Sequence, residues 1–258
     1  MTPPPILLLE ETDSTNAEAR RRAEAGEAGP LWIVARRQTA GRGRRGREWV
    51  SETGNLYATL LITTRKPPAE AAQVTFVAAL AAADLVCELV PPPLVTIKWP
   101  NDVMVEADKL VGILVESGPH EAGGPNAGML WLAVGIGVNL TEAPTGTERP
   151  ATAVADHLKA DVHSTPRIED AAEILAGHFA IWMERWETLG FQPVLDAWIG
   201  RARGLDGPCT ARLGHETLEG MAEGVEADGA LRLRLPDGHL RLISAGDVFF
   251  GSPRGGQG

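Results

Sequence analysis

The arginine-rich stretch "TAGRGRRGREW" at residues 39–49 carries the densest candidate chemistry in the sequence. It sets Arg42, Arg44, Arg45 and Arg47 among three glycines with the spacing G-x-G-x-x-G. In a dinucleotide-binding turn, that spacing leads from a strand into a helix, and an acidic residue about 20 positions later binds the ribose. A strand-like stretch follows here instead, and the acidic residue is missing. We therefore expect a flexible loop with glycine hinges, whose guanidinium groups clamp a phosphate-bearing ligand.

The charge balance supports a local anion site rather than a basic surface. The chain of 258 residues has a formal net charge of −10, which argues against general affinity for nucleic acid or membrane surfaces. Six of its 24 cationic residues nevertheless lie between Arg36 and Arg47. Two alternatives stay open for this loop. One is an RNA- or DNA-binding arginine motif, and the other is a solvated turn.

A second candidate segment is "IKWPNDVMVEADKLVGILVE" at residues 97–116. Lys98, Asn101 and Asp102 lie at a strand-to-loop edge, where functional groups are often displayed. If the segment forms a hairpin about "EAD", Asp102 and Lys109 come close across the two strands. A surface ion pair on a hairpin is the alternative interpretation.

The third segment is "TDSTN" at residues 12–16, just before a helical pattern. Thr15 and Glu18 have the spacing of a capping box, so these side chains are expected to cap the helix. The same hydroxyl and amide groups can also bind a neutral polar ligand. The sequence has no metal-ligand spacing among its six histidines and no nucleophile motif. Its two distant cysteines indicate inert thiols in a reducing compartment.

The order of the expected elements predicts an α+β fold, a mixed sheet with packed helices. Trp182, Trp186 and Leu189 follow a helical period, and the turns "ADGA" and "PDGH" indicate hairpins in a small β-barrel-like domain that begins near Gly207. No apolar run approaches a membrane span and no signal peptide is evident, so we expect a cytoplasmic protein. The expected strands are 6–10, 31–38, 55–64, 94–99, 109–117 and 129–140, and the expected helices are 12–26, 69–90, 151–159, 168–189 and 191–200.

Taken together, "STN", "QTAGRGRRGREW" and "KWPND" followed by "KLVGIL" resemble the biotin protein ligase family. The segment "GLDGPCTARLGHETLEGMAEGVEADGALRLRLPDGHLRLISAGDVFF" is similar to the small C-terminal SH3-like domain of that family. The resemblance implies a biotin/lipoate ligase-type catalytic domain at 1–204, an SH3-like domain at 205–251 and a flexible tail at 252–258. It also implies an enzyme that makes biotinyl-5′-AMP from biotin, ATP and Mg²⁺. The biotin then passes to one lysine of the biotin carrier domain of a carboxylase.

The resemblance further implies roles for individual residues, whereas no metal-binding residue is named and the coordination of Mg²⁺ stays open. Asp102 would stand near the incoming lysine, and Trp49 would pack against the adenine. The implied catalytic residues are Lys109, Asp102, Arg44 and Lys98. The implied biotin-binding residues are Ser14, Thr15, Asn16, Gln38, Arg42, Gly43, Arg44, Lys109 and Gly112. The implied nucleotide-binding residues are Arg44, Arg45, Arg47, Trp49, Asn101, Lys109 and Asn139.

Departures from the family pattern narrow these expectations. Many members begin with a helix-turn-helix domain, whereas "TDSTN" starts here at residue 12, so we expect a monofunctional ligase that does not bind DNA. The "RRxSGGG" signature of lipoate ligases is absent, which makes lipoylation a distant alternative. A protein of this fold that binds biotin without consuming ATP is a further alternative. The sequence leaves monomer and homodimer open.

Overall fold

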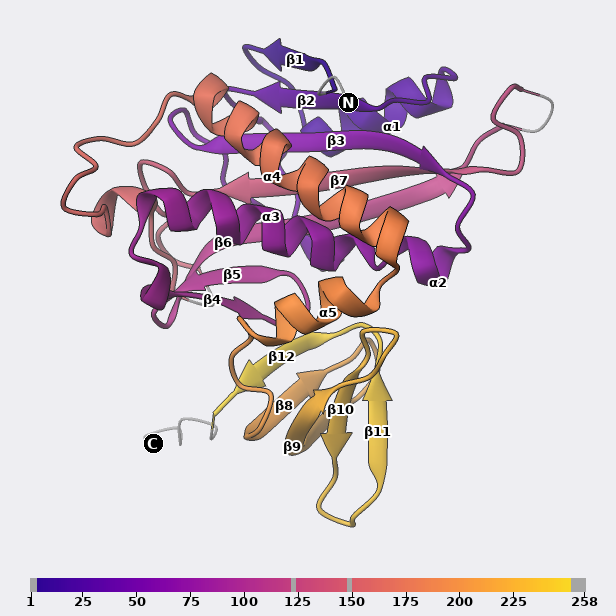
Figure 1. The fold of residues 1–258 in the computed structure, drawn as a ribbon, viewed down its shortest axis with the longest axis vertical. Helices are drawn as coiled ribbons and strands as arrows, with labels where there is room; N and C mark the ends of the chain where they lie inside the picture. The colour runs from indigo at the N-terminus through magenta and orange to yellow at the C-terminus, as the bar shows by residue number, and fades with distance from the viewer. Residues whose placement is uncertain (1–3, 122–123, 148–149, 252–258) are drawn as a thin grey trace.

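The structure is a computed structural model that describes residues 4–121, 124–147 and 150–251. A seven-stranded sheet packed with helices forms the larger part, and a five-stranded sheet forms the smaller part below it (Figure 1). The expected flexible tail at 252–258 lies outside the described residues.

The larger sheet is mixed, as predicted. Its strand order is β1-β2-β3-β7-β6-β5-β4, and only β1 and β2 pair in parallel. Consecutive strands β4, β5 and β6 form a meander at one edge. The strands are β1 (Ile6–Leu9), β2 (Leu31–Ala35), β3 (Leu56–Thr64), β4 (Val95–Lys98), β5 (Asp102–Val105), β6 (Asp108–Pro119) and β7 (Leu130–Val138).

Helices cover the two faces of this sheet unequally. The alanine-rich α3 (Val74–Leu89) and the amphipathic α4 (Ile168–Leu189) lie together over one face and bury the main core (Figure 1). The short α1 (Thr15–Glu24) packs against β3 and β7 from the other face. Because α1 is short, it leaves part of this second face accessible to a ligand.

The aromatic stripe on α4 is buried only in part. Trp182 and Trp186 are buried, and the indole N–H of Trp182 donates to Asp84 at 2.6 Å. The predicted helix at 168–189 is confirmed, but Leu189, at its end, is 66% exposed. The helix ends at this residue, since Gly190 follows with φ +80°, a conformation that favours glycine.

The predicted helix at 151–159 is also wrong, because only a 3₁₀ turn at Val154–Asp156 forms there. The amide N–H of Lys109 donates to the Pro150 carbonyl, and the amide N–H of Thr152 donates to the Lys109 carbonyl, both at 3.0 Å. The chain before the turn thus pairs with β6, which uses the backbone groups that a helix would need.

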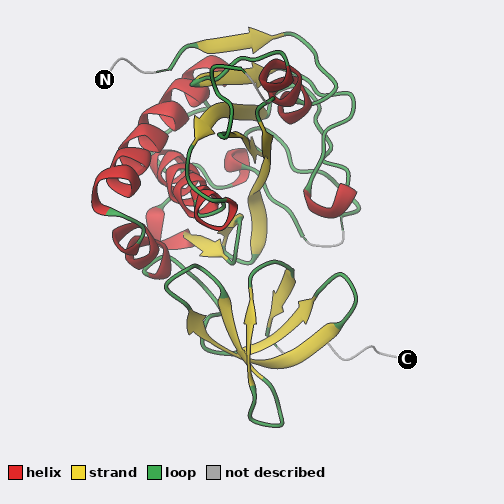
Figure 2. Cartoon of the chain, turned by 90° about the vertical axis from the view of Figure 1, so that its right-hand side faces the viewer, coloured by secondary structure: helices red, strands yellow, loops and turns green. Residues whose placement is uncertain are grey.

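The C-terminal sheet is antiparallel, with the strand order β11-β10-β9-β8-β12. Figure 2 shows its strands as a separate group below the helices and the larger sheet. Both predicted Asp-Gly hairpins are present, at β9–β10 and at β10–β11. Among the described residues no pairing joins β11 to β12, so the expected barrel is an open sheet. The strands are β8 (Pro208–Arg212), β9 (Thr217–Val225), β10 (Leu231–Arg234), β11 (Leu240–Ile243) and β12 (Asp247–Phe250).

Backbone and side-chain contacts join the two parts. After α5 (Gln192–Ile199), the chain pairs with the outer edge of β4 through the bridge between Ile97 and Ala202. The indole N–H of Trp99 donates to the Gly229 carbonyl at 2.9 Å, in the β9–β10 turn. The end of β4 is therefore held against the C-terminal sheet.

One helical stretch, Pro68–Leu89, is apolar and long enough to cross a membrane by length and composition. The sequence-based statement that no run approaches this length is therefore wrong. This stretch comprises the short helix α2 (Pro68–Ala71) and α3, and 67% of its most apolar window is buried inside the fold. Such burial is typical of a core helix.

Candidate active site

A cavity of about 270 Å³ opens on the α1 side of the large sheet. This volume is near the lower end of the roughly 300–1,000 Å³ of ligand clefts. The cavity brings together fourteen of the sixteen site residues predicted from the sequence. These are Ser14, Thr15, Asn16, Gln38, Arg42, Gly43, Arg44, Arg47, Trp49, Asn101, Asp102, Lys109, Gly112 and Asn139.

A hydroxyl–amide network forms one end of the cavity, and we use this name for Thr15, Asn16, Gln38 and Thr59. The Gln38 Oε1 atom accepts hydrogen bonds from the Thr15 amide at 2.8 Å and the Thr15 hydroxyl at 3.1 Å. The fully buried Thr59 hydroxyl lies 2.8 Å from Thr15 Oγ1 and donates to Asn16 Oδ1 at 2.7 Å. Because all of these groups are neutral, this end suits a polar ligand without net charge.

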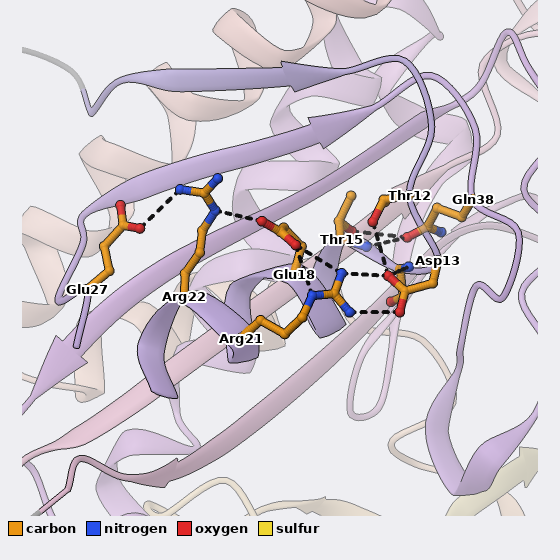
Figure 3. Close-up of polar contacts among 9 residues, drawn as sticks. Thr12, Asp13, Thr15, Glu18, Arg21, Arg22, Glu27 and Gln38 are labelled. Atoms are coloured by element: carbon orange, nitrogen blue, oxygen red, sulfur yellow. Dashed lines mark hydrogen bonds and ion pairs between the residues drawn. The ribbon is translucent and has the colours of Figure 1, made fainter. Parts of the chain in front are cut away.

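The predicted capping box does not form at the start of α1. Ser14 is the N-cap and makes no side-chain cap bond, while the Thr15 hydroxyl turns to Gln38. Glu18 pairs with Arg21 and Arg22 instead. Figure 3 shows Arg21 also forking onto Asp13 through two 2.8 Å bonds, and this partner lowers the pKa of the Asp13 carboxyl. These ion pairs fix the turn that presents Thr15.

Asn16 lies flat on strand β7 at a position that only glycine allows. A Cβ atom on Gly135 would lie 2.1 Å from Asn16 Oδ1. The Asn16 Nδ2 group donates to Glu116 Oε2 at 2.8 Å and to the Leu114 carbonyl at 3.2 Å. Both ends of this amide are thus fixed, which leaves little freedom for its orientation.

The β5–β6 hairpin forms as predicted and places a cation–anion pair in the cavity wall. Lys109 Nζ lies 2.6 Å from Asp102 Oδ1, and the Asp102 side chain is only 8% exposed. The pairing shifts between Val103 and Met104, so Lys109 opposes Met104. Without this bulge Lys109 would alternate to the other face, and the extra residue, Leu110, brings it to the face of Asp102.

Gly112 and Gly137 oppose each other on β6 and β7 and form a flat floor in the cavity. The indole of Trp49 lies on this floor, and a Cβ atom on either glycine would come within 2.7 Å of the ring. We expected a ligand to lie on Gly112, and the structure shows the Trp49 ring there. The Trp49 Nε1 atom is buried and has no hydrogen-bond partner among the described residues, so a donor remains for an incoming group.

The arginine loop, residues 39–49, folds over the cavity mouth. An isolated antiparallel β-bridge joins the backbones of Arg42 and Glu48 at the base of the loop. A Cβ atom on Gly41 would lie 2.4 Å from Ser51 Oγ. Arg44 Nη1 donates to Asn101 Oδ1 at 3.0 Å. The loop therefore contacts the strand-to-loop edge that the sequence marked as functional.

Asn101 and Asn139 are buried by different contacts. Asn101 Nδ2 donates to the Ile113 carbonyl at 2.5 Å, which aims its oxygen at Arg44. Asn139 Nδ2 donates to the Thr152 carbonyl at 3.0 Å and holds the segment beside Lys109.

Arg45 and Lys98 do not line the cavity. Arg45 contacts Asp247 of the C-terminal sheet at 3.4 Å, and Lys98 Nζ lies 5.5 Å from the centre of the Phe249 ring. Both side chains are directed to the junction between the two parts of the chain.

Sequence reasoning missed four residues at this site. Thr59 is a polar residue within the otherwise apolar stretch 58–62 of β3, and Gly135 and Gly137 interrupt a strand, so each carries a recognisable signal. Asp247 has a weaker signal, because an acid at a strand end is common.

Comparisons with known proteins place this chain in a family. Residues 8–134 match the biotin/lipoate A/B protein ligase family, and residues 204–251 match the biotin protein ligase C-terminal domain. The chain is 43% identical to the biotin–[acetyl-CoA-carboxylase] ligase of Paracoccus denitrificans, over 95% of this chain and 100% of that protein.

Solved structures agree. The biotin protein ligase of Aquifex aeolicus in complex with biotin and ATP matches with a TM-score of 0.76 at 22% identity, covering 95% of this chain and 99% of that one. The biotin protein ligase of Leishmania major in complex with biotinyl-5-AMP matches with a TM-score of 0.60 at 27% identity, covering 94% and 100%. This chain belongs to the biotin protein ligase family.

Proposed function

We propose that this chain is an ATP-dependent biotin protein ligase. It activates biotin to biotinyl-5′-AMP with release of pyrophosphate, and then transfers biotin to a lysine of a biotin carrier domain with release of AMP. One observation carries this proposal. A single cavity joins a neutral hydrogen-bonding end, the Lys109–Asp102 pair and a cationic loop. The full-length similarity to a named ligase and the fold shared with ligand-bound ligases support it.

The hydroxyl–amide network is the proposed site for the ureido ring of biotin. That ring carries N–H donors and a carbonyl acceptor, which an apolar pocket would leave unpaired at a cost of about 1–3 kcal/mol each. Ser14, Thr15, Asn16 and Gln38 offer both kinds of partner. Arg42, Gly43 and Gly112 complete the proposed wall of the biotin site.

Lys109 and the loop arginines are the proposed electrostatic catalysts of the first step. An oxygen of the biotin carboxylate attacks the α-phosphorus of ATP, and the bond between the α-phosphorus and the bridging oxygen to the β-phosphate breaks. Two anions must approach each other, so fixed cations lower the barrier. Lys109 and Arg44 both line the cavity, as do Arg47 and Trp49 of the loop, and Asn101 and Asn139 lie in the surrounding wall.

Asp102 is the proposed group that receives the carrier lysine. This amine is mostly protonated at pH 7, so a carboxylate orients it and helps to remove its proton. The free amine then attacks the carbonyl of the mixed anhydride and displaces AMP. Lys98 and Arg45, which lie outside the cavity lining, are proposed to act indirectly by holding the domain junction.

Magnesium would enter with the nucleotide. Mg²⁺ in such enzymes is bound mainly by substrate phosphates and water, with one or two carboxylates. We propose that the phosphates of ATP carry the ion; among the described residues no group of three His, Cys, Asp or Glu side chains is arranged to hold a metal. Bound there, the ion would neutralise phosphate charge.

The proposed macromolecular partner is the carrier domain of a biotin-dependent carboxylase, and the proposed location is the cytoplasm. The net charge of −10 disfavours nucleic acid as a partner. Arg44, Arg45 and Arg47 have hydrogen-bond acceptors within the chain, and Arg42 lines the cavity. These contacts explain why the loop arginines cluster, without any role for nucleic acid.

The test is a mass measurement on a purified carrier domain. With biotin, ATP and Mg²⁺, we expect one biotin to be added to one carrier lysine, together with release of AMP and pyrophosphate. A carrier whose acceptor lysine is replaced by arginine is the matched control. Absence of any mass gain at saturating substrates contradicts the proposal. A mass gain with lipoate but not with biotin would indicate a lipoate ligase instead.

A further inference from the structure

The C-terminal sheet reaches into the cavity at a single turn. Gly246 and Asp247 both line the cavity, although they lie about 200 residues from the arginine loop. The Gly246 carbonyl accepts from Arg44 Nη2 at 2.9 Å. Asp247 Oδ2 accepts from Arg47 at 2.7 Å and from Arg45 at 3.4 Å. Three of the four loop arginines thus donate to this turn.

The Asp247 carboxylate is much more deeply buried than the two arginines that it contacts. Its side chain is only 7% exposed, whereas those of Arg45 and Arg47 are 37% and 46% exposed. A buried carboxylate is unfavourable unless charged or polar partners satisfy it. The acid is therefore fixed by the fold, at the start of β12, and the loop comes to it.

The loop in turn needs a counter-charge. Four guanidinium groups within six residues repel one another, and Arg45 adopts φ 58° and ψ 30°, which non-glycine residues seldom occupy. Such backbone persists where surrounding contacts determine it. The contacts of Arg45 and Arg47 with one carboxylate supply this determination.

We propose that Asp247 is a positioning residue for adenylation. From the C-terminal sheet it holds Arg45 and Arg47 at the side of the cavity mouth, and so presents the loop to the phosphates of ATP. This inference rests on the proposed function. It assigns to the C-terminal sheet a part in the chemistry of the catalytic sheet, through one carboxylate.

The geometry favours positioning over simple competition with phosphate. A simple competitor would contact only a cation that binds the ligand. Asp247 pairs with the cavity-lining Arg47, but the same carboxylate also holds Arg45, which does not line the cavity, and so ties two positions of the loop to the C-terminal sheet. Removing the carboxylate should therefore weaken ATP use rather than improve it.

The test compares the two substrates in Asp247→Asn. We expect the KM for ATP to rise about tenfold, as is typical of losing one charge-assisted hydrogen bond, and pyrophosphate release to slow. The KM for biotin should change less than twofold. Asp247→Glu should restore part of the loss. The control is Glu223→Gln, because Glu223 pairs with Arg234 on the same sheet, has a side chain that is 36% exposed and does not line the cavity.

Arg45→Gln tests the same contact from the loop and does not disturb the buried turn. It should raise the KM for ATP in the same direction, and its effect should not add to that of Asp247→Asn. If Asp247→Asn does not fold, Arg45→Gln alone still tests the proposal. Equal rises in both KM values, additive effects or tighter ATP binding would overturn the proposal. A wild-type enzyme without biotin-dependent pyrophosphate release would instead refute the proposed function.

Discussion

The two ends of the cavity are built on opposite principles. The hydroxyl–amide network is neutral, largely buried and confined to the large sheet and α1. The arginine loop is charged and largely exposed, and its contacts reach a second sheet. A buried network keeps its shape without a ligand, whereas a glycine-rich loop is costly to order. We infer that the biotin end is preformed, whereas the nucleotide end is anchored to the C-terminal sheet through Asp247 and becomes fully ordered only on binding.

Lys109 lies between these two ends, so its loss should have the largest effect. Lys109→Ala removes a cation beside the reacting carboxylate and phosphate. We expect biotin-dependent pyrophosphate release to fall at least ~10²-fold, the loss typical of one electrostatic stabiliser. The control is Lys66→Ala, a lysine paired with Glu70 outside the cavity. Near-normal release from Lys109→Ala would contradict the assignment.

Asp102→Asn should separate the two half-reactions. If Asp102 receives the carrier lysine, transfer from preformed biotinyl-5′-AMP should fall about 10²-fold, at the lower end for a general base. Adenylate formation should fall less. Single-turnover measurements of each half-reaction give the comparison, and equal losses would indicate general positioning instead.

Thr59→Val tests whether the buried network serves biotin. The change keeps the shape but removes the donor to Asn16, so the KM for biotin should rise about tenfold with little change for ATP. Thr59→Ser should restore it. The control is Thr63→Val on the same strand, whose hydroxyl donates to the Ala28 carbonyl away from the cavity. Equal changes in both KM values would count against a preformed biotin site.

Arg44→Gly tests the assembled end. It removes the contacts to Asn101 and Gly246 and adds backbone freedom, so the loop should close less firmly over the adenylate. Adenylate should still form, and bystander proteins should gain several-fold more biotin, measured by mass spectrometry. Arg65→Gly, at an exposed loop position, is the control. If Arg44→Gly adds no more biotin to bystander proteins than the wild type does, the interpretation of the loop as a clamp is wrong.

The smallest effect concerns the two thiols. Burial raises the pKa of Cys209 to about 11 and also raises that of Cys87. Alkylation requires the thiolate, so both should react slowly at pH 7, and Cys209 should react faster only as the pH approaches 11. Treatment with iodoacetamide at pH 7 should change ligase activity less than twofold. Rapid inactivation would point to a thiol near the reacting groups.

The sequence predicted the fold where local patterns coincide with long-range contacts. The apolar run of β3, the strand pattern of β6 and the Asp-Gly turns each predict their element, and the hairpin about "EAD" correctly brings Asp102 to Lys109. The helix expected at 151–159 failed because its backbone pairs with β6 instead. A local sequence pattern does not show which distant strand a segment pairs with.

The sequence predicted which residues form the site better than it predicted the contacts between them. Residues of one motif, such as those of the arginine loop, are visible together in the sequence. Thr59 and Asp247 are polar residues next to apolar neighbours in their strands, and their importance comes from residues that are 43 and 200 positions away in the chain. The floor of Gly112 and Gly137 depends in the same way on strand register.

Hydrogen exchange gives the most direct test of the division between a preformed and an assembled end. Amides at residues 12–16 should be protected in the free enzyme and change little with ligand, because their network is already complete. Amides of the arginine loop should exchange fast in the free enzyme and become at least about tenfold slower with biotin and a non-hydrolysable ATP analogue. Equal protection of both segments without ligands, or a loop that ligands leave unchanged, would contradict this account.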